Sequence, residues 1–143
     1  MKGESMAFDI QSVEYYYITV EGHVGEASKM LSVFADVGVN LLAFEAVPLG
    51  PMRTQFTLFP DDGLKMTDGA KKAGLTLDGP HSALLIKGDN DEPGALAGIY
   101  EKLSKARINV YASNGIADIK GGYGVILCFK QGDYEKAVAA LEV

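Results

Sequence analysis

The sequence repeats itself at an offset of 69 residues, and this repeat constrains the fold more than any other feature. At this offset Gly25 aligns with Gly94, and without gaps Asn40 aligns with Asn109. Apolar residues also recur at matching positions, with the spacing of one face of an α-helix. They are Ala27, Met30, Leu31, Phe34 and Val37 in the first copy, and Leu96, Ile99, Tyr100, Leu103 and Ala106 in the second. The matching helices indicate an internal duplication.

Both copies predict the same order of elements, because β-branched and aromatic runs alternate with the helical pattern and with Gly/Pro turns. The first copy predicts a strand at 13–20, a helix at 25–37, strands from 39–41 and at 55–59, a helix opened by Asp61-Asp62 and a closing strand at 75–77. The second predicts a strand at 83–87, a helix at 94–106, strands from 108–110 and at 125–129, a helix from Asp133 to Ala140 and a closing strand at 141–143.

The order βαββαβ is the ferredoxin-like arrangement. The sequence therefore predicts an α+β fold of two tandem ferredoxin-like βαββαβ repeats, residues 13–79 and 80–143, with antiparallel sheets packed side by side. Gly79-Pro80 is too short to act as a flexible linker between them. We expect the second repeat's first helix to begin at 91–94, where an acidic residue caps free amides and Pro93 occupies the first turn.

Charge and hydropathy exclude several classes of protein. The formal net charge of −6 and the scattering of the 13 Lys and Arg residues argue against a sequence-independent grip on nucleic acid. No run approaches the roughly 20 apolar residues of a membrane helix, and residues 1–5 do not resemble a signal peptide. We therefore expect a cytoplasmic protein that binds neither nucleic acid nor membrane.

The sequence predicts no catalytic residue, no metal site and no cofactor. His23 and His81 lie beside no recognised nucleophile motif. The acidic cluster at 89–92 lacks the spacing of a calcium loop and suits a helix start. The glycines at 121–124 lie between two predicted strands, so they indicate a hairpin turn and not a nucleotide-binding loop. Cys128 stands alone within an apolar run, which indicates a buried side chain.

Two segments of the second copy carry a family resemblance. Asp91-Glu92-Pro93-Gly94-Ala95-Leu96, followed by a helix and then by Arg107-Ile108-Asn109-Val110, resembles the signature of ACT domains. Residues 37–44 resemble the matching entry into the second strand of the first copy. The resemblance covers residues 13–143 and is to small stand-alone proteins made of two ACT repeats. It implies a regulatory, allosteric module that binds an amino acid, and we expect a homodimer without catalytic activity.

The resemblance also implies where the ligand binds. In ACT domains two copies pair edge to edge, and an amino acid lies between the turn after the first strand of one copy and the Asn that begins the second strand of its neighbour. Helix amides suit a carboxylate, and acidic or amide side chains suit an ammonium group. Carried over, one site combines Asn40 with Asp89, Asn90, Asp91, Gly94 and Ala95 of the second copy. The reciprocal site combines Asn109 with His23 and Gly25 of the first copy.

The two sites are unequal, because the first copy has His23-Val24-Gly25 where the second has Glu92-Pro93-Gly94. Simpler roles remain open: each Asn can bond its own backbone, Gly25 and Gly94 can serve close packing, and Asp91 can cap a helix. Two functions therefore compete. One is a sensor that binds an amino acid, and the other is a regulatory subunit that docks on a separate metabolic enzyme without a ligand of its own. An enzyme is a third, weaker alternative.

Overall fold

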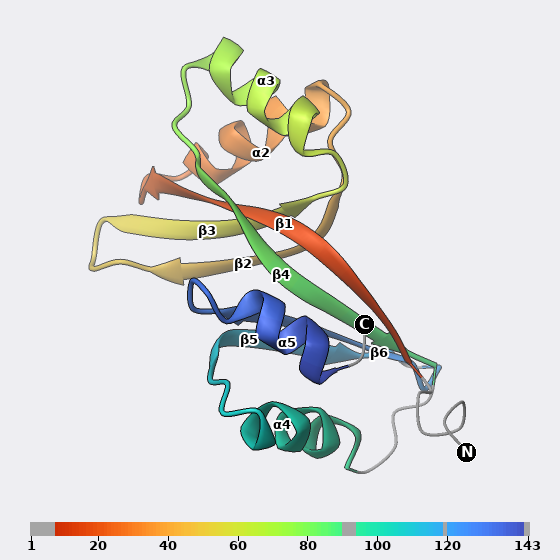
Figure 1. Ribbon diagram of the computed structural model, residues 1–143. Helices are drawn as coiled ribbons and strands as arrows, with labels where there is room; N and C mark the ends of the chain where they lie inside the picture. Colours follow the sequence, from red (N-terminus) through yellow and green to blue (C-terminus); the bar gives the residue numbers. More distant parts are fainter. Residues whose placement is uncertain (1–7, 90–93, 119, 142–143) are drawn as a thin grey trace. The chain divides into compact units, whose positions relative to one another are not determined.

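The computed structural model describes residues 8–89, 94–118 and 120–141, and the elements in these ranges alternate as the repeat predicts (Figure 1). The strands are β1 (Phe8–Glu21), β2 (Leu41–Pro48), β3 (Arg53–Pro60), β4 (Asp78–Gly88), β5 (Val110–Ala117) and β6 (Tyr123–Phe129). The helices are α2 (Glu26–Asp36), α3 (Gly63–Ala73), α4 (Ala95–Lys105) and α5 (Tyr134–Ala140).

The chain divides into two compact units. The first unit is Glu14–His81, and the second unit joins Met1–Val13 to Ser82–Val143. Strands β1 and β4 cross these bounds, so each of them contributes residues to both units. Each unit is an α+β unit with antiparallel strand pairs, as the sequence predicts.

In the first unit β3 lies between β1 and β2 and pairs antiparallel with both. Alternate side chains of β1 and β3 point to the helix side, because side chains along a strand alternate between the two faces. Helices α2 and α3 cover that face (Figure 1). The buried core between them consists of Tyr16, Ile18, Met30, Phe34, Phe56, Leu58, Met66 and Ala70.

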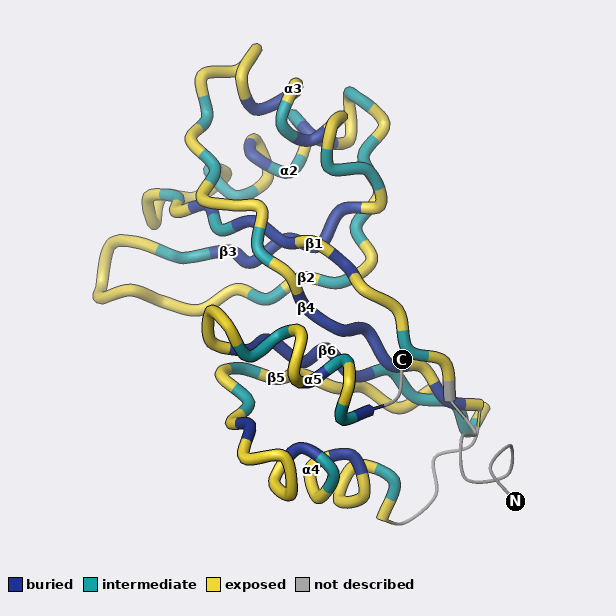
Figure 2. The backbone as a smooth tube through the Cα atoms, in the orientation of Figure 1, coloured by how far each residue is buried: buried dark blue, intermediate teal, exposed yellow. Residues whose placement is uncertain are grey.

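In the second unit β6 lies between β4 and β5 and pairs antiparallel with both. Residues 83–86 of β4 and 125–129 of β6 are buried, whereas β5 is largely exposed (Figure 2). The start of β1 belongs to this unit as well. Ile10 packs against its core, and the Ser12 hydroxyl hydrogen-bonds to the hydroxyl of Tyr134 in α5.

The predicted helices are confirmed, and α2 and α4 end within one residue of the expected bounds. Asp62 and Asp133 occupy the N-cap positions of α3 and α5, as the sequence predicts. The expected helix start at 91–93 lies outside the described residues. Helix α4 begins at Ala95 after Gly94, whose φ of 89° is in the left-handed region.

The prediction of a closing strand at 75–77 is wrong. Residues 75–77 form no strand, because Leu75 and Leu77 instead pack against the first unit's core in an irregular connection. Leu141 lies in a turn and is buried in the second unit's core, while 142–143 lie outside the described residues. In addition, Leu96 and Tyr100 are exposed, so the buried face of α4 is narrower than its apolar spacing predicts.

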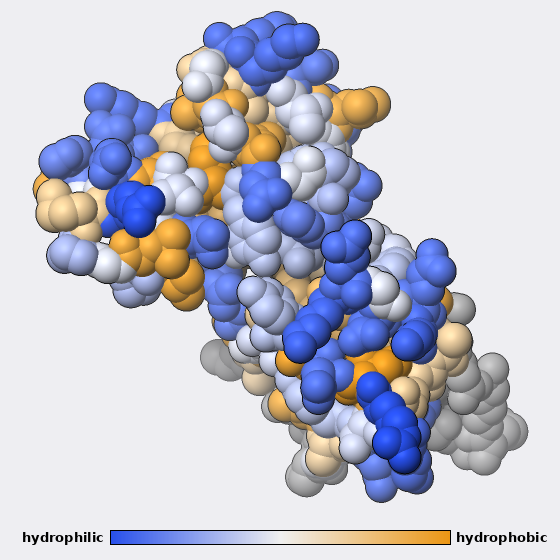
Figure 3. Space-filling model, turned by 60° about the vertical axis from the view of Figure 1, so that its left-hand side comes forward, coloured by the Kyte–Doolittle hydropathy of each residue, from blue (hydrophilic) through white to orange (hydrophobic). Residues whose placement is uncertain are grey.

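No helix in the described ranges is both long enough and apolar enough to cross a membrane. Within the same ranges no three His, Cys, Asp or Glu side chains form a group that would hold a metal ion. Hydrophobic side chains occur in several separate groups among hydrophilic ones on the face shown in Figure 3.

Candidate functional site

The two repeats begin their first helices in the same way. Gly25 and Gly94 are the N-cap residues of α2 and α4, with φ of 91° and 89°, a conformation that glycine adopts without a steric penalty. Neither glycine can offer a capping side chain, and no side-chain cap is found at either helix start among the described residues. The Glu26 amide at the start of α2 donates to the His23 carbonyl at 3.1 Å. The other first-turn amides of a helix have no partner within the helix, so these two starts are suited to an anion such as a carboxylate.

The turn after the first strand lies against the hairpin between the second and third strands in each unit. In the first unit the Gly22 amide donates to the Met52 carbonyl at 2.6 Å. In the second unit a Cβ on Gly122 would lie 3.1 Å from the Gly88 carbonyl oxygen, so a side chain there would crowd the backbone. Asp89 follows Gly88 directly and is exposed. The hairpin thus supports the turn that carries the predicted ligand residues.

Asn40 is exposed and directly precedes β2. Its amide donates to Asp61 Oδ1 at 3.0 Å, and its carbonyl accepts from the Asp61 amide at 2.8 Å. These two bonds fix the Asn40 backbone and leave its side-chain amide outside this pairing. Both bonds are made by the Asn40 backbone, so the two roles that the sequence leaves open for its side chain stay predictions.

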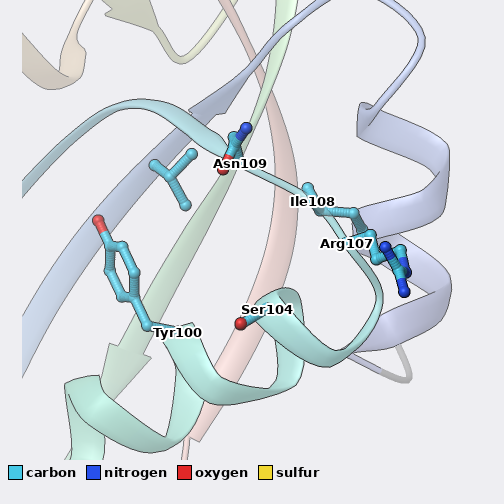
Figure 4. A pocket seen from close by; sticks show the side chains of 6 residues that line it. Tyr100, Ser104, Arg107, Ile108 and Asn109 are labelled. Atoms are coloured by element: carbon cyan, nitrogen blue, oxygen red, sulfur yellow. The ribbon is translucent and has the colours of Figure 1, made fainter.

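Asn109 directly precedes β5, and it lines a cavity of about 460 Å³ in the second unit. The other residues that line this cavity are Tyr100, Ser104, Arg107, Ile108 and Val110. Figure 4 shows Ser104 and Asn109 lying between Tyr100 at one end of the row and Arg107 at the other. The volume falls within the range of small-molecule sites, about 300–1,000 Å³.

Three polar side chains that line this cavity, those of Tyr100, Ser104 and Arg107, are not among the site residues predicted from the sequence. Tyr100 was assigned to the buried helix face, but its hydroxyl lies 2.6 Å from Ser113 Oγ of β5. Ser104 and Arg107 carried no signal in the helical pattern. One sign was available for Arg107, because the 69-residue offset places it opposite Gly38 at the end of the first helix.

The predicted site residues thus fall into two sets. The second unit holds Asp89, Gly94, Ala95 and Asn109, and the first unit holds His23, Gly25 and Asn40. Asn90 and Asp91 lie outside the described residues. Each predicted site combines residues of one unit with residues of the other.

His81, the second of the two histidines considered in the sequence, lies within a strand. It belongs to β4, and its ring centroid lies 5.1 Å from that of Tyr15 and 5.2 Å from that of Tyr17. His81 Nε2 also lies 3.2 Å from Asp78 Oδ1. This packing gives His81 a structural role in the first unit. Cys128 is buried in β6, as its apolar surroundings predict.

The fold is that of the regulatory parts of aspartate kinase, as comparison with solved structures shows. The regulatory subunit of aspartate kinase from Thermus thermophilus matches with a TM-score of 0.63 and 17% identity, over 94% of each chain. The aspartate kinase of Clostridium acetobutylicum, an allosteric enzyme, matches with a TM-score of 0.53 and 19% identity, over 93% of this chain and 33% of that chain.

A further match is protein BT0572 from Bacteroides thetaiotaomicron, with a TM-score of 0.80 and 17% identity, over 93% of this chain and 88% of that chain. No protein-family model matches the sequence, and no curated protein matches it significantly. At these identities the likeness establishes the fold.

Proposed function

We propose that this protein is a non-catalytic regulatory protein that binds an amino acid between paired repeats and transmits its occupancy to a metabolic enzyme. The observation that carries the proposal is the pair of matching helix starts, where Gly25 and Gly94 offer no capping side chain to the first-turn amides. The likeness of the fold to regulatory subunits of aspartate kinase supports the regulatory role.

The proposed ligand lies between a helix start of one repeat and an Asn of the other. Its carboxylate accepts hydrogen bonds from the first amides of α4, and its ammonium group is held by Asp89 and by the side chain of Asn40. Asn90, Asp91, Gly94 and Ala95 complete this site. The reciprocal site pairs Asn109 with His23 and Gly25, and it has fewer polar side chains. We expect it to bind more weakly.

The test is a thermal-shift screen with the twenty amino acids at millimolar concentration. A ligand at 100 times its Kd stabilises the folded protein by about 2.7 kcal/mol, which raises its melting temperature clearly. We expect Asn40→Ala and Asp89→Ala to remove the shift, because both side chains are exposed and outside the two cores. Asp68→Ala, an exposed carboxylate on α3, is the control and should leave the shift unchanged.

Each result of the screen has a definite meaning. A shift by one amino acid that both site variants abolish supports the sensor. A shift that survives in Asn40→Ala and Asp89→Ala contradicts the assigned residues. If no amino acid shifts the melting temperature, the sensor is rejected.

A second candidate function is docking on a separate enzyme without a ligand. Exposed apolar side chains on the edge strands favour it, among them Phe44 on β2 and Tyr111 and Ile116 on β5, which are 62%, 63% and 80% exposed. An edge strand with few charges readily pairs with another chain. We expect light scattering to show a homodimer, and co-purification of a metabolic enzyme that is insensitive to every amino acid would favour this second function.

A further inference from the structure

Each unit has an end at which its first helix closes and its second helix begins. In the first unit the Asn40 amide donates to Asp61 Oδ1 at 3.0 Å, so the connection after α2 lies beside the connection after β3. In the second unit Val110 pairs with Phe129, which brings the connections after α4 and β6 together in the same way. The two places are termed the helix-closing ends below.

The two helix-closing ends carry opposite charges at equivalent positions. The first is formed by residues 36–40 and 61–65, and the 69-residue offset places residues 105–109 and 130–134 at the second. The charged residues of the first are Asp36, Asp61, Asp62 and Lys65. Those of the second are Lys105, Arg107, Lys130 and Asp133. Three acids against one base give the first a formal charge of −2, and three bases against one acid give the second +2, so they form an acidic end and a basic end.

Two of these charged residues occupy positions that are unfavourable for their own elements. The C-terminus of a helix carries partial negative charge, which disfavours a carboxylate in the last turn. Helix α2 nevertheless ends at Asp36 and has no basic residue in its last turn. Arg107 has a φ of 61° and is the only non-glycine residue with a positive φ in the part of the chain that the structure describes. A residue with a Cβ is strained there, and such strain is concentrated at functional sites. Both charges therefore indicate a use outside their own helix.

The charges that distinguish the two ends are open to solvent. Asp36, Arg107 and Lys130 are exposed. None of the three forms an ion pair with another residue in the described ranges. Figure 4 shows the Arg107 side chain directed away from the other labelled polar side chains, so its charge faces away from the interior of that cavity. Each end thus presents an excess of charge of one sign to a binding partner.

We propose that the basic end of one molecule binds the acidic end of a second copy of this chain. The two ends are built by equivalent segments of the same fold, so they can meet about an approximate two-fold axis that sets each charge of one end against the opposite charge of the other. Two like ends repel each other, so the charges select the pairing of a first unit with a second unit. The contact requires no bound ligand and is therefore independent of the amino-acid site proposed above.

The experiment measures self-association of the full chain by analytical ultracentrifugation without amino acids. It is run at about 0.1 M and about 1 M salt, between which the Debye length falls from about 10 Å to about 3 Å. Two double variants each reverse the charge of one end.

The first double variant, Asp36→Lys with Asp61→Asn, makes both ends positive and keeps a side-chain oxygen for the Asn40 amide. The second, Arg107→Asp with Lys130→Glu, makes both ends negative, and an aspartate tolerates the left-handed backbone. The control is Lys71→Glu with Lys72→Glu, two exposed residues in the last turn of α3. It changes the net charge of the chain as much as the second double variant does, but at the other end of α3 from the acidic end.

We expect the wild type to self-associate with a Kd that rises at least about tenfold between the lower and the higher salt concentration, because exposed charges are screened. Each double variant alone should associate at least about tenfold more weakly than the wild type at the lower salt concentration, since its two ends carry the same sign. An equimolar mixture of the two double variants should return to within about threefold of the wild type, because every end then finds an opposite charge. The control should also stay within about threefold.

Recovery in the mixture also shows that both double variants are folded, and melting curves check this for each one separately. If either double variant does not fold, the mixing experiment is repeated with Asp36→Lys and Lys130→Glu as single variants, which change exposed residues without a printed side-chain bond.

Other results overturn the inference. A wild type that is monomeric at both salt concentrations rejects it, and so does self-association that is insensitive to salt. A mixture that associates no more tightly than the separate double variants, or a control that loses as much as they do, rejects the pairing of unlike ends. The amino-acid screen is judged separately: salt-sensitive pairing without any bound amino acid keeps this inference and rejects the proposed function, and amino-acid binding by a monomer does the reverse.

Discussion

Gly69 and Gly98 lie in the interiors of two helices, and their surroundings predict opposite effects of the same substitution. Gly69 in α3 is buried, and a Cβ there would lie 2.9 Å from Cγ2 of Val37 at the end of α2. Gly98 in α4 is exposed, and a Cβ there would meet no atom within 4 Å. Alanine is favoured over glycine in a helix by about 1 kcal/mol. Gly98→Ala should therefore increase the free energy of unfolding by about 1 kcal/mol.

At Gly69 the same gain is opposed by overpacking. A methyl group at 2.9 Å from Val37 must push α2 and α3 apart, and added methyl groups in a packed core cost about 1–3 kcal/mol. Gly69→Ala should therefore lower the free energy of unfolding by up to about 2 kcal/mol. Shortening Val37 removes the obstacle, so in a Val37→Ala background Gly69→Ala should stabilise by about 1 kcal/mol.

The assay is urea unfolding followed by far-ultraviolet circular dichroism for wild type, the three single variants and the Gly69/Val37 double variant. Linear extrapolation gives the free energy of each, and the cycle should yield a coupling of about 1–3 kcal/mol between the two positions. If Gly69→Ala stabilises the wild type as much as Gly98→Ala does, α3 does not pack on Val37 as described, and the reasoning is refuted.

Three further perturbations test other contacts. Arg107→Gly should raise the free energy of unfolding by about 1 kcal/mol because the left-handed backbone is no longer strained, and urea unfolding that shows a loss would contradict this. Asp62→Ala should lower the free energy of unfolding by about 1 kcal/mol, since the Asp62 carboxylate accepts hydrogen bonds from two first-turn amides at 3.1 and 3.2 Å. Asp133→Ala removes no such bond, so it should lower the free energy of unfolding by less in the same assay. Burial, with the charge of Glu14, raises the pKa of Tyr16 above 10.0, so folding stability should fall as pH rises from 10 through that pKa, and Tyr16→Phe should flatten the decline in alkaline melting curves.

The sequence predicts the local elements of this fold well because each has its own periodicity. The helices are specified by repeated apolar spacing and by Asp62 and Asp133 at their starts, so their bounds agree within one or two residues. The closing strand predicted at 75–77 failed for a physical reason. Each unit also contains the end of a strand that continues into the other unit. Residues 8–13 of β1 belong to the second unit, and residues 78–81 of β4 belong to the first. Pairing between segments distant in sequence leaves no local pattern.

The site is less accessible from sequence than the fold. A glycine before each helix and an Asn before each second strand are visible as repeated positions, and they lie at the helix starts and strand entries as expected. The cavity is not visible in this way, because Tyr100 satisfies the apolar spacing while its hydroxyl bonds to Ser113. Arg107 can be noticed in the sequence as the counterpart of Gly38, but its left-handed backbone conformation is known only from the structure.

The division of β1 between the two units sets an order for folding during synthesis. Residues 14–81 form the first unit, which can fold as soon as they leave the ribosome. Residues 8–13 emerge earlier, yet their partners, including Tyr134, emerge about 120 residues later. At synthesis rates of about 5–20 residues per second, residues 8–13 are therefore synthesised several seconds before these partners. Residues 8–13 thus remain without their partners in the second unit until that unit has been synthesised.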